Sequence, residues 1–535
     1  MTPSIALQQQ QSIGDWLADA AYRHPSAALT VEGCATSVAE VDVLAGRSAA
    51  GFRALGLVPG DRVCLVMSAG VEALAVWFGL ARAGLVEVPL NPGSGSQLLR
   101  YCIEQSGATV VVCDGEREAA VRECLQGVDA VRHLVVAGPG AAGTDRRGPE
   151  GRGARVHRVT LDEVLDHAAD TSCDVDPASA AVILYTSGTT GPPKGVLLSH
   201  RANINLARHT VSLLEYTAAD RLYSVFPLYH SNARYCSVMA AIESGADLVM
   251  HRRFSASRFW DICREHGITA FNYQGAMMSI LHKQPPRPDD ADNPVRLGFG
   301  APCPPEIFAD FERRFQVRLT EIYGSTEVSI VTDMPPWDRK IGTAGNESEN
   351  YQVAVVDAGD EPVAAGTTGE IVVRPKKPGW MFDGYHRMPE ATATSWRNLW
   401  FHTGDRGYLD DEGFLTFVDR LKDTVRRRGE NISSWEIERV VGQHSDVAQV
   451  AAYGVPSELS EEEVMVAVVP RDGRTVDPAG LVAHCSGALT SFAVPRYVRR
   501  VEALPMTPSQ RVEKYRLRAE GVTEDTWDSQ GRQND

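Results

Sequence analysis

Residues 185–200 read YTSGTTGPPKGVLLSH and directly follow the apolar run Ala180–Leu184 (AAVIL). The apolar run is typical of a buried strand, and glycine, serine and threonine fill the turn after it. Glycines let a backbone approach an anion closely, while N–H groups, hydroxyls and Lys194 supply donors and positive charge. The loop has neither the G-x-x-x-x-G-K-S/T pattern nor the G-x-G-x-x-G pattern. From these residues alone, an anion-binding loop and a polar surface turn are both open interpretations.

The sequence around this loop alternates between strand and helix patterns. Asp61–Met67 (DRVCLVM) and Ala108–Asp114 (ATVVVCD) are short apolar runs rich in β-formers, and residues 70–84 (GVEALAVWFGLARAG) between them have the composition of a buried helix. This alternation predicts an α/β fold in which parallel or mixed sheets are flanked by helices.

The pattern changes in the last third of the chain. From Gln352 to about Arg420, short strands and turns follow one another, which predicts a β-subdomain. A compact segment of mixed helix and strand patterns comes next. We therefore expect a large N-terminal domain of residues 1–421 and a small α+β domain of residues 422–535.

The composition is that of an ordinary globular protein: of 535 residues, 43% are hydrophobic and 23% are charged. We expect no membrane span, because no apolar run approaches the roughly 18 residues that one requires, and no signal peptide. The ten cysteines are scattered without a Cys-x-x-Cys pair, which predicts reduced thiols, a cytoplasmic location and no zinc site. The net charge of −16 disfavours nucleic acid as a partner but leaves an anionic small molecule open.

Three further stretches give the opening loop its meaning. They are Glu321–Glu327 (EIYGSTE), Phe401–Gly407 (FHTGDRG) and Val418–Glu438 (VDRLKDTVRRRGENISSWEIE). Together with the loop, in this order and spacing, they resemble the motifs of the adenylate-forming superfamily, which comprises acyl-CoA synthetases, peptide-synthetase adenylation domains and luciferases. The resemblance extends from about residue 12 to about residue 520. Residues 272–305 look closest to the carnitine or crotonobetaine CoA ligase branch.

The resemblance implies that ATP and an acid form an acyl-adenylate with loss of pyrophosphate, in a reaction that depends on positioning and electrostatics. The residues implied for the phosphates are Thr186, Ser187, Gly188, Thr189, Thr190, Lys194 and Thr326. Those implied for the adenosine part are Gly300, Ala301, Pro302, Tyr323, Gly324, Ser325, Asp405 and Arg420. Glu327 is expected to hold Mg²⁺, which prefers carboxylate and phosphate oxygens.

The acid and the acceptor are expected on the other side of the site. The implied substrate-binding residues are Tyr229, His230, Asn232, Arg234, Tyr273, Gln274 and Gly275. Arg234 is interpreted either as a grip on a second carboxylate of the substrate or as a residue on an outer helix face. The small domain is expected to rotate about Lys422. Gly429, Glu430 and Asn431 would then face the acceptor, and the arginines before them are either a solvated patch or a CoA contact.

One departure from the family pattern lies near the C-terminus. The family shows T-P-x-G-K or T-P-x-E-K, whereas this chain reads LPMTPSQRVEKYRLR (Leu504–Arg518), with Arg511 at the lysine position. Three interpretations are open: Arg511 serves in altered geometry, Lys514 replaces the lysine, or the activated acid differs from an ordinary carboxylate. The last has a family precedent in relatives that activate nitrous acid and pass it to an aryl amine, giving a diazonium.

We therefore expect an AMP-forming ligase that adenylates a small acid and passes it to CoA. The alternatives are an ATP-dependent diazotase acting on nitrite and an amino-aryl acid, and a non-catalytic homologue that binds nucleotide. A carrier thiol or an aryl amine is open as acceptor, and so is a homodimer.

Overall fold

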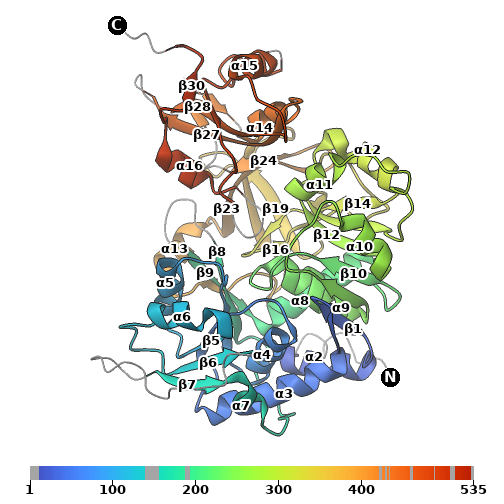
Figure 1. Ribbon diagram of the computed structural model, residues 1–535, viewed down its shortest axis with the longest axis vertical. Coiled ribbons are helices and arrows are strands. Elements are labelled where there is room, and N and C mark those ends of the chain that lie inside the picture. Colours follow the sequence, from blue (N-terminus) through green and yellow to red (C-terminus); the bar gives the residue numbers. More distant parts are fainter. Residues whose placement is uncertain are drawn as a thin grey trace.

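The computed structural model describes residues 11–138, 156–186, 193–420, 425–427, 430–432, 434–457, 462–486, 488–506 and 512–531. Two large sheets lie side by side, with a β-subdomain above them and a separate small domain at the C-terminal end (Figure 1). The predicted α/β fold with a β-subdomain and a small α+β C-terminal part is confirmed.

The first large sheet has eight strands. Neighbouring strands pair in parallel, except that β9 is antiparallel to both of its neighbours, β8 and β21. In spatial order they are β21 (Gly384–Tyr385), β9 (Lys194–Ser199), β8 (Ala180–Thr186), β4 (Val86–Pro89), β3 (Arg62–Val66), β5 (Val110–Asp114), β6 (His133–Ala137) and β7 (His157–Thr160).

The second large sheet has seven strands, all parallel except β2. In spatial order they are β14 (Arg318–Glu321), β13 (Leu297–Ala301), β12 (Ala270–Gln274), β10 (Arg221–Ser224), β11 (Asp247–Met250), β1 (Ala28–Val31) and β2 (Cys34–Ser37).

Alternation along β3 shows how the sequence builds two layers of core. Val63 and Leu65 point into the cluster shared by both large sheets, whereas Cys64 and Val66 belong to a second cluster on the other face. Successive side chains of a strand point to opposite faces, so an uninterrupted apolar run can be buried on both sides.

Helices cover both sheets. The helices before β8 in the chain are α2 (Ile13–Arg23), α3 (Val38–Ala54), α4 (Val71–Arg82), α5 (Ser96–Ser106), η1 (Gly115–Arg117), α6 (Glu118–Cys124) and α7 (Leu161–Leu165). The helices between β9 and β14 include α8 (His200–Leu214), α9 (Ala240–Ser244), α10 (Phe259–His266), α11 (Gly275–His282) and α12 (Pro305–Phe315). Before α9 runs η2 (Asn232–Met239), a π-helical segment of a kind that is rare and frequent at functional sites.

Capping explains where several of these helices begin. Ser12 and Asp15 form a capping box at α2, and Ser37 with Glu40 forms another at α3. In each, the serine side chain accepts from a backbone N–H while the carboxylate accepts from the capping residue, which satisfies donors that the first turn leaves without partners.

The β-subdomain is antiparallel. Its five-stranded sheet contains β19 (Tyr351–Val356), β20 (Gly369–Pro375), β23 (Trp400–Leu409), β22 (Trp396–Arg397) and β24 (Leu415–Arg420). Two short ribbons, β15 (Gly324–Ser325) with β16 (Ser329–Ile330) and β17 (Thr332–Asp333) with β18 (Asn346–Glu347), connect it to the second large sheet, and α13 (Pro389–Ser395) follows β21.

The C-terminal part has its own hydrophobic cores. Its buried residues form two clusters. The members of one lie between Val425 and Val498, those of the other lie between Ala451 and Leu517, and neither cluster includes a described residue before Val425. Its strands are β25 (Val425–Arg427), β26 (Glu430–Ile432), β27 (Val447–Pro456), β28 (Glu462–Pro470), β29 (Tyr497–Arg500) and β30 (Thr526–Asp528), and its helices are α14 (Ser434–Gly442), α15 (Pro478–Ser486) and α16 (Lys514–Glu520). The boundary at residues 421 and 422 falls outside the described residues and stays a prediction.

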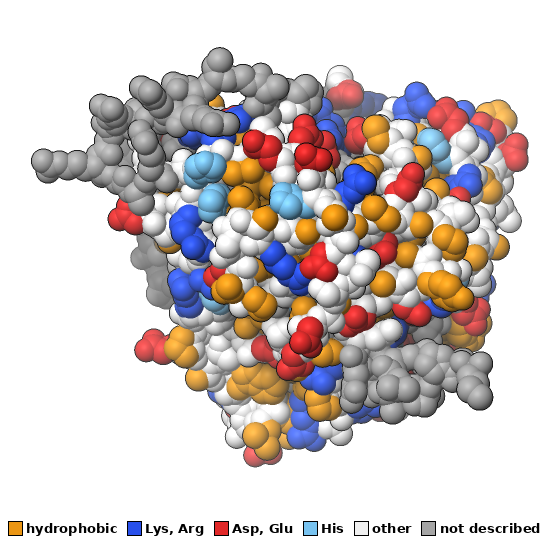
Figure 2. All heavy atoms as spheres, turned by 90° about the horizontal axis from the view of Figure 1, so that it is seen from below, with side chains coloured by type: hydrophobic (Ala, Val, Ile, Leu, Met, Phe, Trp, Pro, Cys, Tyr) orange, Lys and Arg blue, Asp and Glu red, His pale blue; other side chains and the backbone are white. Residues whose placement is uncertain are grey.

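On the face seen from below, acidic and basic side chains are interspersed among hydrophobic ones (Figure 2). Within the described part of the chain, no helix combines the length and the apolar character needed to cross a bilayer.

Candidate active site

The opening loop connects two antiparallel neighbours. Thr186 at the end of β8 pairs with Lys194 at the start of β9, and its Oγ1 donates to the Lys194 carbonyl oxygen at 3.4 Å. The predicted phosphate-binding residues Ser187, Gly188, Thr189 and Thr190 lie outside the described residues. The connection therefore starts and ends at the carboxyl end of β8.

Beside this connection lies a cluster around Glu327. The Ser325 hydroxyl donates to Glu327 Oε2 at 2.8 Å, and the Tyr385 hydroxyl donates to Oε1 at 3.1 Å. Lys194 Nζ lies 4.6 Å from the centre of the Tyr385 ring. Burial and the charge of Glu327 raise the pKa of Tyr385, so its hydroxyl stays a donor. Thus a cation, a neutral donor and a carboxylate meet at one point, and Thr326 lies in the turn beside them.

A second cluster surrounds Asp405. The Tyr323 hydroxyl donates to Asp405 Oδ2 at 2.8 Å, and Arg420 Nε lies 3.4 Å from Oδ1. The register of β23 and β24 places Asp405 directly opposite Arg420. Burial and the neighbouring Asp405 raise the pKa of Tyr323 well above its ordinary value. The structure thus brings together three residues that belong to three separate sequence motifs.

Close backbone approach explains two of the predicted glycines. A Cβ on Gly300 would lie 2.1 Å from the Tyr273 carbonyl oxygen, and one on Gly324 would lie 1.8 Å from the Ser329 carbonyl oxygen. Gly300 and Ala301 end β13, Pro302 follows them, and Gly324 opens β15. Any side chain at either glycine would force neighbouring backbone apart.

Several of the residues expected around the acid lie together on η2 and at the end of β12. The rings of Tyr229 and His230 are 4.7 Å apart, and Asn232 Oδ1 accepts from Asn272 Nδ2 at 3.0 Å. Asn272 Nδ2 also donates to Ser237 Oγ at 2.8 Å. Gln274 ends β12, with an Oε1 that is buried and without a hydrogen bond from any described residue, and Gly275 opens α11. A polar wall therefore runs along η2 and the end of β12.

Tyr273 departs from its expected role. Its side chain is fully buried, and its hydroxyl donates to the Thr320 carbonyl oxygen at 3.2 Å inside the seven-stranded sheet. Because successive side chains of a strand alternate between faces, Tyr273 points away from the face that carries Asn272 and Gln274. Its contribution is to packing.

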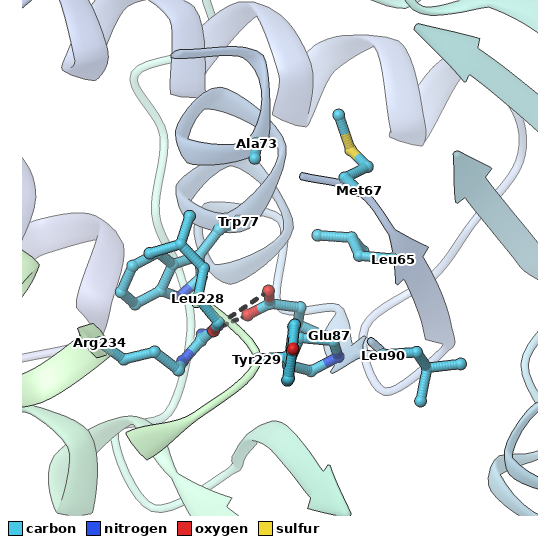
Figure 3. A pocket seen from close by; sticks show the side chains of 10 residues that line it. Leu65, Met67, Ala73, Trp77, Glu87, Leu90, Leu228, Tyr229 and Arg234 are labelled. Atoms are coloured by element: carbon cyan, nitrogen blue, oxygen red, sulfur yellow. Dashed lines mark hydrogen bonds and ion pairs between the residues drawn. The ribbon is translucent and has the colours of Figure 1, made fainter. Parts of the chain in front are cut away.

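Arg234 fits neither of its expected roles. It is only 1% exposed, so it does not lie on an outer helix face. Its guanidinium makes a two-pronged ion pair with Glu87, donates to the Leu228 carbonyl oxygen at 3.1 Å and lies 3.8 Å from the centre of the Trp77 ring (Figure 3). The Glu87 carboxylate thus takes the two N–H donors of the Arg234 guanidinium that a second carboxylate of the substrate was expected to bind.

Lys514 lies where the small domain meets β24. Its Nζ donates to Ser434 Oγ at 2.6 Å and lies 2.9 Å from Glu438 Oε1. Ser434 in turn donates from its backbone N–H and its hydroxyl to Asp419 Oδ2, at 2.7 and 2.9 Å. Lys514 on α16 therefore binds α14, and Ser434 on α14 binds β24. Lys422, Gly429 and Arg511, and the side chains of Glu430 and Asn431, lie outside what the structure describes.

Three residues of the clusters were not expected from the sequence: Tyr385, Glu87 and Glu321. Glu321 ends β14, accepts a hydrogen bond from the Cys303 backbone N–H, and has its pKa raised to about 8 by burial. A carboxylate that opens the EIYGSTE motif was a usable signal for it. Glu87 and Tyr385 had none, because their partners are distant in the sequence.

The chain is similar to known proteins over most of its length. The AMP-binding enzyme family matches residues 17–386, and the family of its C-terminal domain matches residues 436–511. The chain is 31% identical to crotonobetaine/carnitine–CoA ligase of Proteus mirabilis, over 90% of this chain and 92% of that one. It is also 31% identical to long-chain fatty acid transport protein 1 of Homo sapiens, over 90% of this chain and 78% of that one.

Solved structures give the same picture of the fold. ATP-bound MatB from Rhodopseudomonas palustris superposes with a TM-score of 0.81 at 27% identity, covering 95% of this chain and 99% of the other. The anthranilate CoA ligase AuaEII in complex with anthranoyl-AMP superposes with a TM-score of 0.84, covering 96% and 98%. That second likeness, at 19% identity, concerns the fold.

Glu321 generates a prediction on pH. The pKa of Glu321 is about 8 in the folded chain, against an ordinary value of 4.5. Between these two pH values the folded state therefore keeps a proton that the unfolded state has lost. The resulting stabilisation is complete below the unfolded-state pKa and is lost as the pH rises to the folded-state pKa. Relative to Glu321→Gln, wild type should lose up to about 1.4 kcal/mol of unfolding free energy per pH unit between about pH 5 and about pH 8.

Thermal unfolding across that pH range measures the difference. Glu349→Gln, which removes an exposed carboxylate, is the control and should follow the wild-type curve. Parallel curves for wild type and Glu321→Gln would contradict the assignment of a protonated Glu321.

Proposed function

This chain belongs to the AMP-binding enzyme family, and on that premise we propose that it is an AMP-forming ligase that joins a small acid to ATP, releases pyrophosphate and passes the acyl group to an acceptor, with CoA as the expected one. The CoA ligases among its relatives, including the Proteus mirabilis enzyme, support the choice of acceptor.

One observation carries the proposal. The segment from Tyr323 to Glu327 joins both carboxylate clusters, because Tyr323 binds Asp405 and Glu327 binds Tyr385. A nucleotide has a diol at one end and a polyphosphate at the other. A carboxylate beside Arg420 suits the diol, and a carboxylate beside Lys194 suits a metal-bound phosphate chain.

The Glu327 cluster fits Mg²⁺. From the described residues each Glu327 oxygen accepts one hydrogen bond, which leaves it a further lone pair, and hard oxygen ligands are those that Mg²⁺ selects. The described residues contain no group of three His, Cys, Asp or Glu side chains able to hold a metal, so phosphate oxygens would complete the coordination. Mg²⁺ bound there would offset the negative charge of the leaving pyrophosphate.

The chemistry then follows from positioning. A carboxylate oxygen of the acid attacks the α-phosphorus of ATP, forming a new O–P bond while the bond to pyrophosphate breaks. Lys194 and the loop after Thr186 would align the phosphates, Thr326 would contact the α-phosphate, and His230 would stand beside the incoming carboxylate. Fixed charges and donors lower the barrier here because they need no reorganisation.

The small domain enters through its hinge. We propose that it begins at Lys422 and rotates there, bringing residues 429–431 toward the acceptor for the second step. Asp419, immediately before this hinge, is bonded to Ser434 beyond it, so the contact has to open when the domain turns.

A second candidate keeps the same adenylation step but uses nitrite as the acid and an aryl amine as the acceptor. Arg511 at the family's lysine position favours it. Arg234 no longer does, because Glu87 holds its guanidinium. A non-catalytic nucleotide-binding homologue is the third candidate.

An AMP-release screen tests all three. With ATP, Mg²⁺ and a panel of small acids that includes nitrite, with and without CoA, we expect acid-dependent AMP formation. Asp405→Ala should lower kcat/KM about a hundredfold, because the diol loses a charged acceptor. Asp357→Asn, in an exposed turn of the β-subdomain, is the matched control. Nucleotide binding without AMP from any acid would select the non-catalytic alternative.

Tyr385 should matter through Glu327. Tyr385→Phe removes a donor to a charged acceptor, so we expect the KM for ATP to rise about tenfold and the Mg²⁺ requirement to shift upward. Tyr408→Phe, on β23, is the control. An unchanged Mg²⁺ dependence would show that Glu327 does not need this hydroxyl.

Two measurements distinguish the roles of Arg511 and Lys514: the rate of AMP formation and the thermal midpoint. We expect Arg511→Ala to slow AMP formation at least about tenfold. Lys514→Ala should mainly lower the thermal midpoint, because the partly buried Glu438 loses the cation that compensates its charge. AMP formation that is insensitive to both changes would refute a role for this segment in adenylation.

A further inference from the structure

A small pocket lies between α4 and η2, beside the end of β4 (Figure 3). Its volume is about 20 Å³, which is room for about one water molecule. Trp77, Glu87, Tyr229 and Arg234 supply its polar and aromatic surface, and aliphatic side chains such as Leu65 and Leu90 supply the rest. The sequence pointed to Tyr229 and Arg234 as substrate-binding residues, but not to Trp77 or Glu87.

The charges in this pocket are balanced. The side chains of Arg234 and Glu87 are 1% and 3% exposed and form an ion pair with each other. Burial raises the pKa of Glu87, and the charge of Arg234 opposes that shift. A second carboxylate here would leave two buried negative charges against one positive charge, and an ammonium would leave an excess of positive charge. Both are costly, so the pocket favours a neutral group.

Hydrogen-bonding capacity is nevertheless left over. Arg234 Nε is buried and makes no hydrogen bond of ordinary geometry with a described residue, although the adjacent Tyr235 hydroxyl, which does not line the pocket, interacts with the Arg234 side chain. Both Glu87 oxygens keep a lone pair beyond the bonds from Arg234. A hydroxyl or an uncharged amino group both donates and accepts hydrogen bonds, so it would suit the acceptor oxygens of Glu87 and the N–H of Arg234 that the ion pair does not use.

The pocket adjoins the expected acid site. Tyr229 lines it and precedes His230, whose ring centre is 4.7 Å away. We propose that this pocket receives one neutral amino or hydroxyl group of the small-molecule substrate and selects against a second carboxylate. This proposal rests on the proposed function, and the group can be carried either by the acid that is adenylated or by an acceptor amine.

Four benzoates test it on the full-length protein: 3-aminobenzoate, 3-hydroxybenzoate, benzoate and isophthalate. Calorimetry with ATP and Mg²⁺ present measures binding, and AMP release is followed with and without nitrite. We expect the amino or hydroxy compound to bind at least about tenfold more tightly than benzoate, with isophthalate weakest. AMP release without nitrite marks the benzoate as the acid, and release only with nitrite marks the amino compound as the acceptor.

The matched variants replace one buried ion pair each. In Glu87→Met with Arg234→Leu, apolar side chains of similar volume replace both charges, and the preference over benzoate should fall to about twofold or less. Asp290→Met with Arg314→Leu removes a second largely buried pair, outside the pocket, and should keep the preference. If the first double variant does not fold, Glu87→Gln, which puts an N–H donor beside Arg234, should reduce the same preference.

The outcomes that overturn the proposal are specific. They are an amino or hydroxy compound that binds no better than benzoate, tightest binding of isophthalate, and a preference that survives in the pocket variants. Selective binding without AMP from any acid leaves the pocket standing and removes the proposed function instead.

Discussion

The parallel pairing of β12, β13 and β14 is the constraint on which the candidate site depends. Parallel strands end at the same edge of a sheet, so Gln274, Ala301 and the Tyr323 segment emerge together although they are far apart in the sequence. Gly300 allows β12 and β13 to approach each other there, where any side chain would collide with the Tyr273 carbonyl oxygen. The carboxylate clusters form because this edge meets the β-subdomain.

The parts of the fold that could be predicted are those with local signals. Short apolar runs separated by helix patterns specify strands buried on both faces, as Val63, Cys64, Leu65 and Val66 show. The motif around Tyr323 and Glu327 could be located because its residues are contiguous. Even Tyr273 had a signal, since alternation along β12 separates it from Asn272 and Gln274.

The remainder depended on contacts that no window of sequence contains. Glu87 lies on β4 of the first large sheet and Arg234 on η2, and they meet only when the two large sheets pack together. Tyr385 reaches Glu327 because β21 adds to the edge of β9. Lys514 is near Arg511 in the chain, but its partners on α14 decide what it does. In each case a buried charge or donor is satisfied from a distance, which folding requires and sequence spacing does not record.

The π-helical winding of η2 has an evolutionary consequence. A π-helix holds one more residue in a turn than an α-helix, and each residue of an α-helix turns the chain by about 100°. Loss of a single residue within Asn232–Met239 would let this segment wind as an α-helix, so the side chains inside it would change direction while those of α9 keep theirs. One deletion would therefore re-aim Asn232 and Arg234 together, which no single point substitution does.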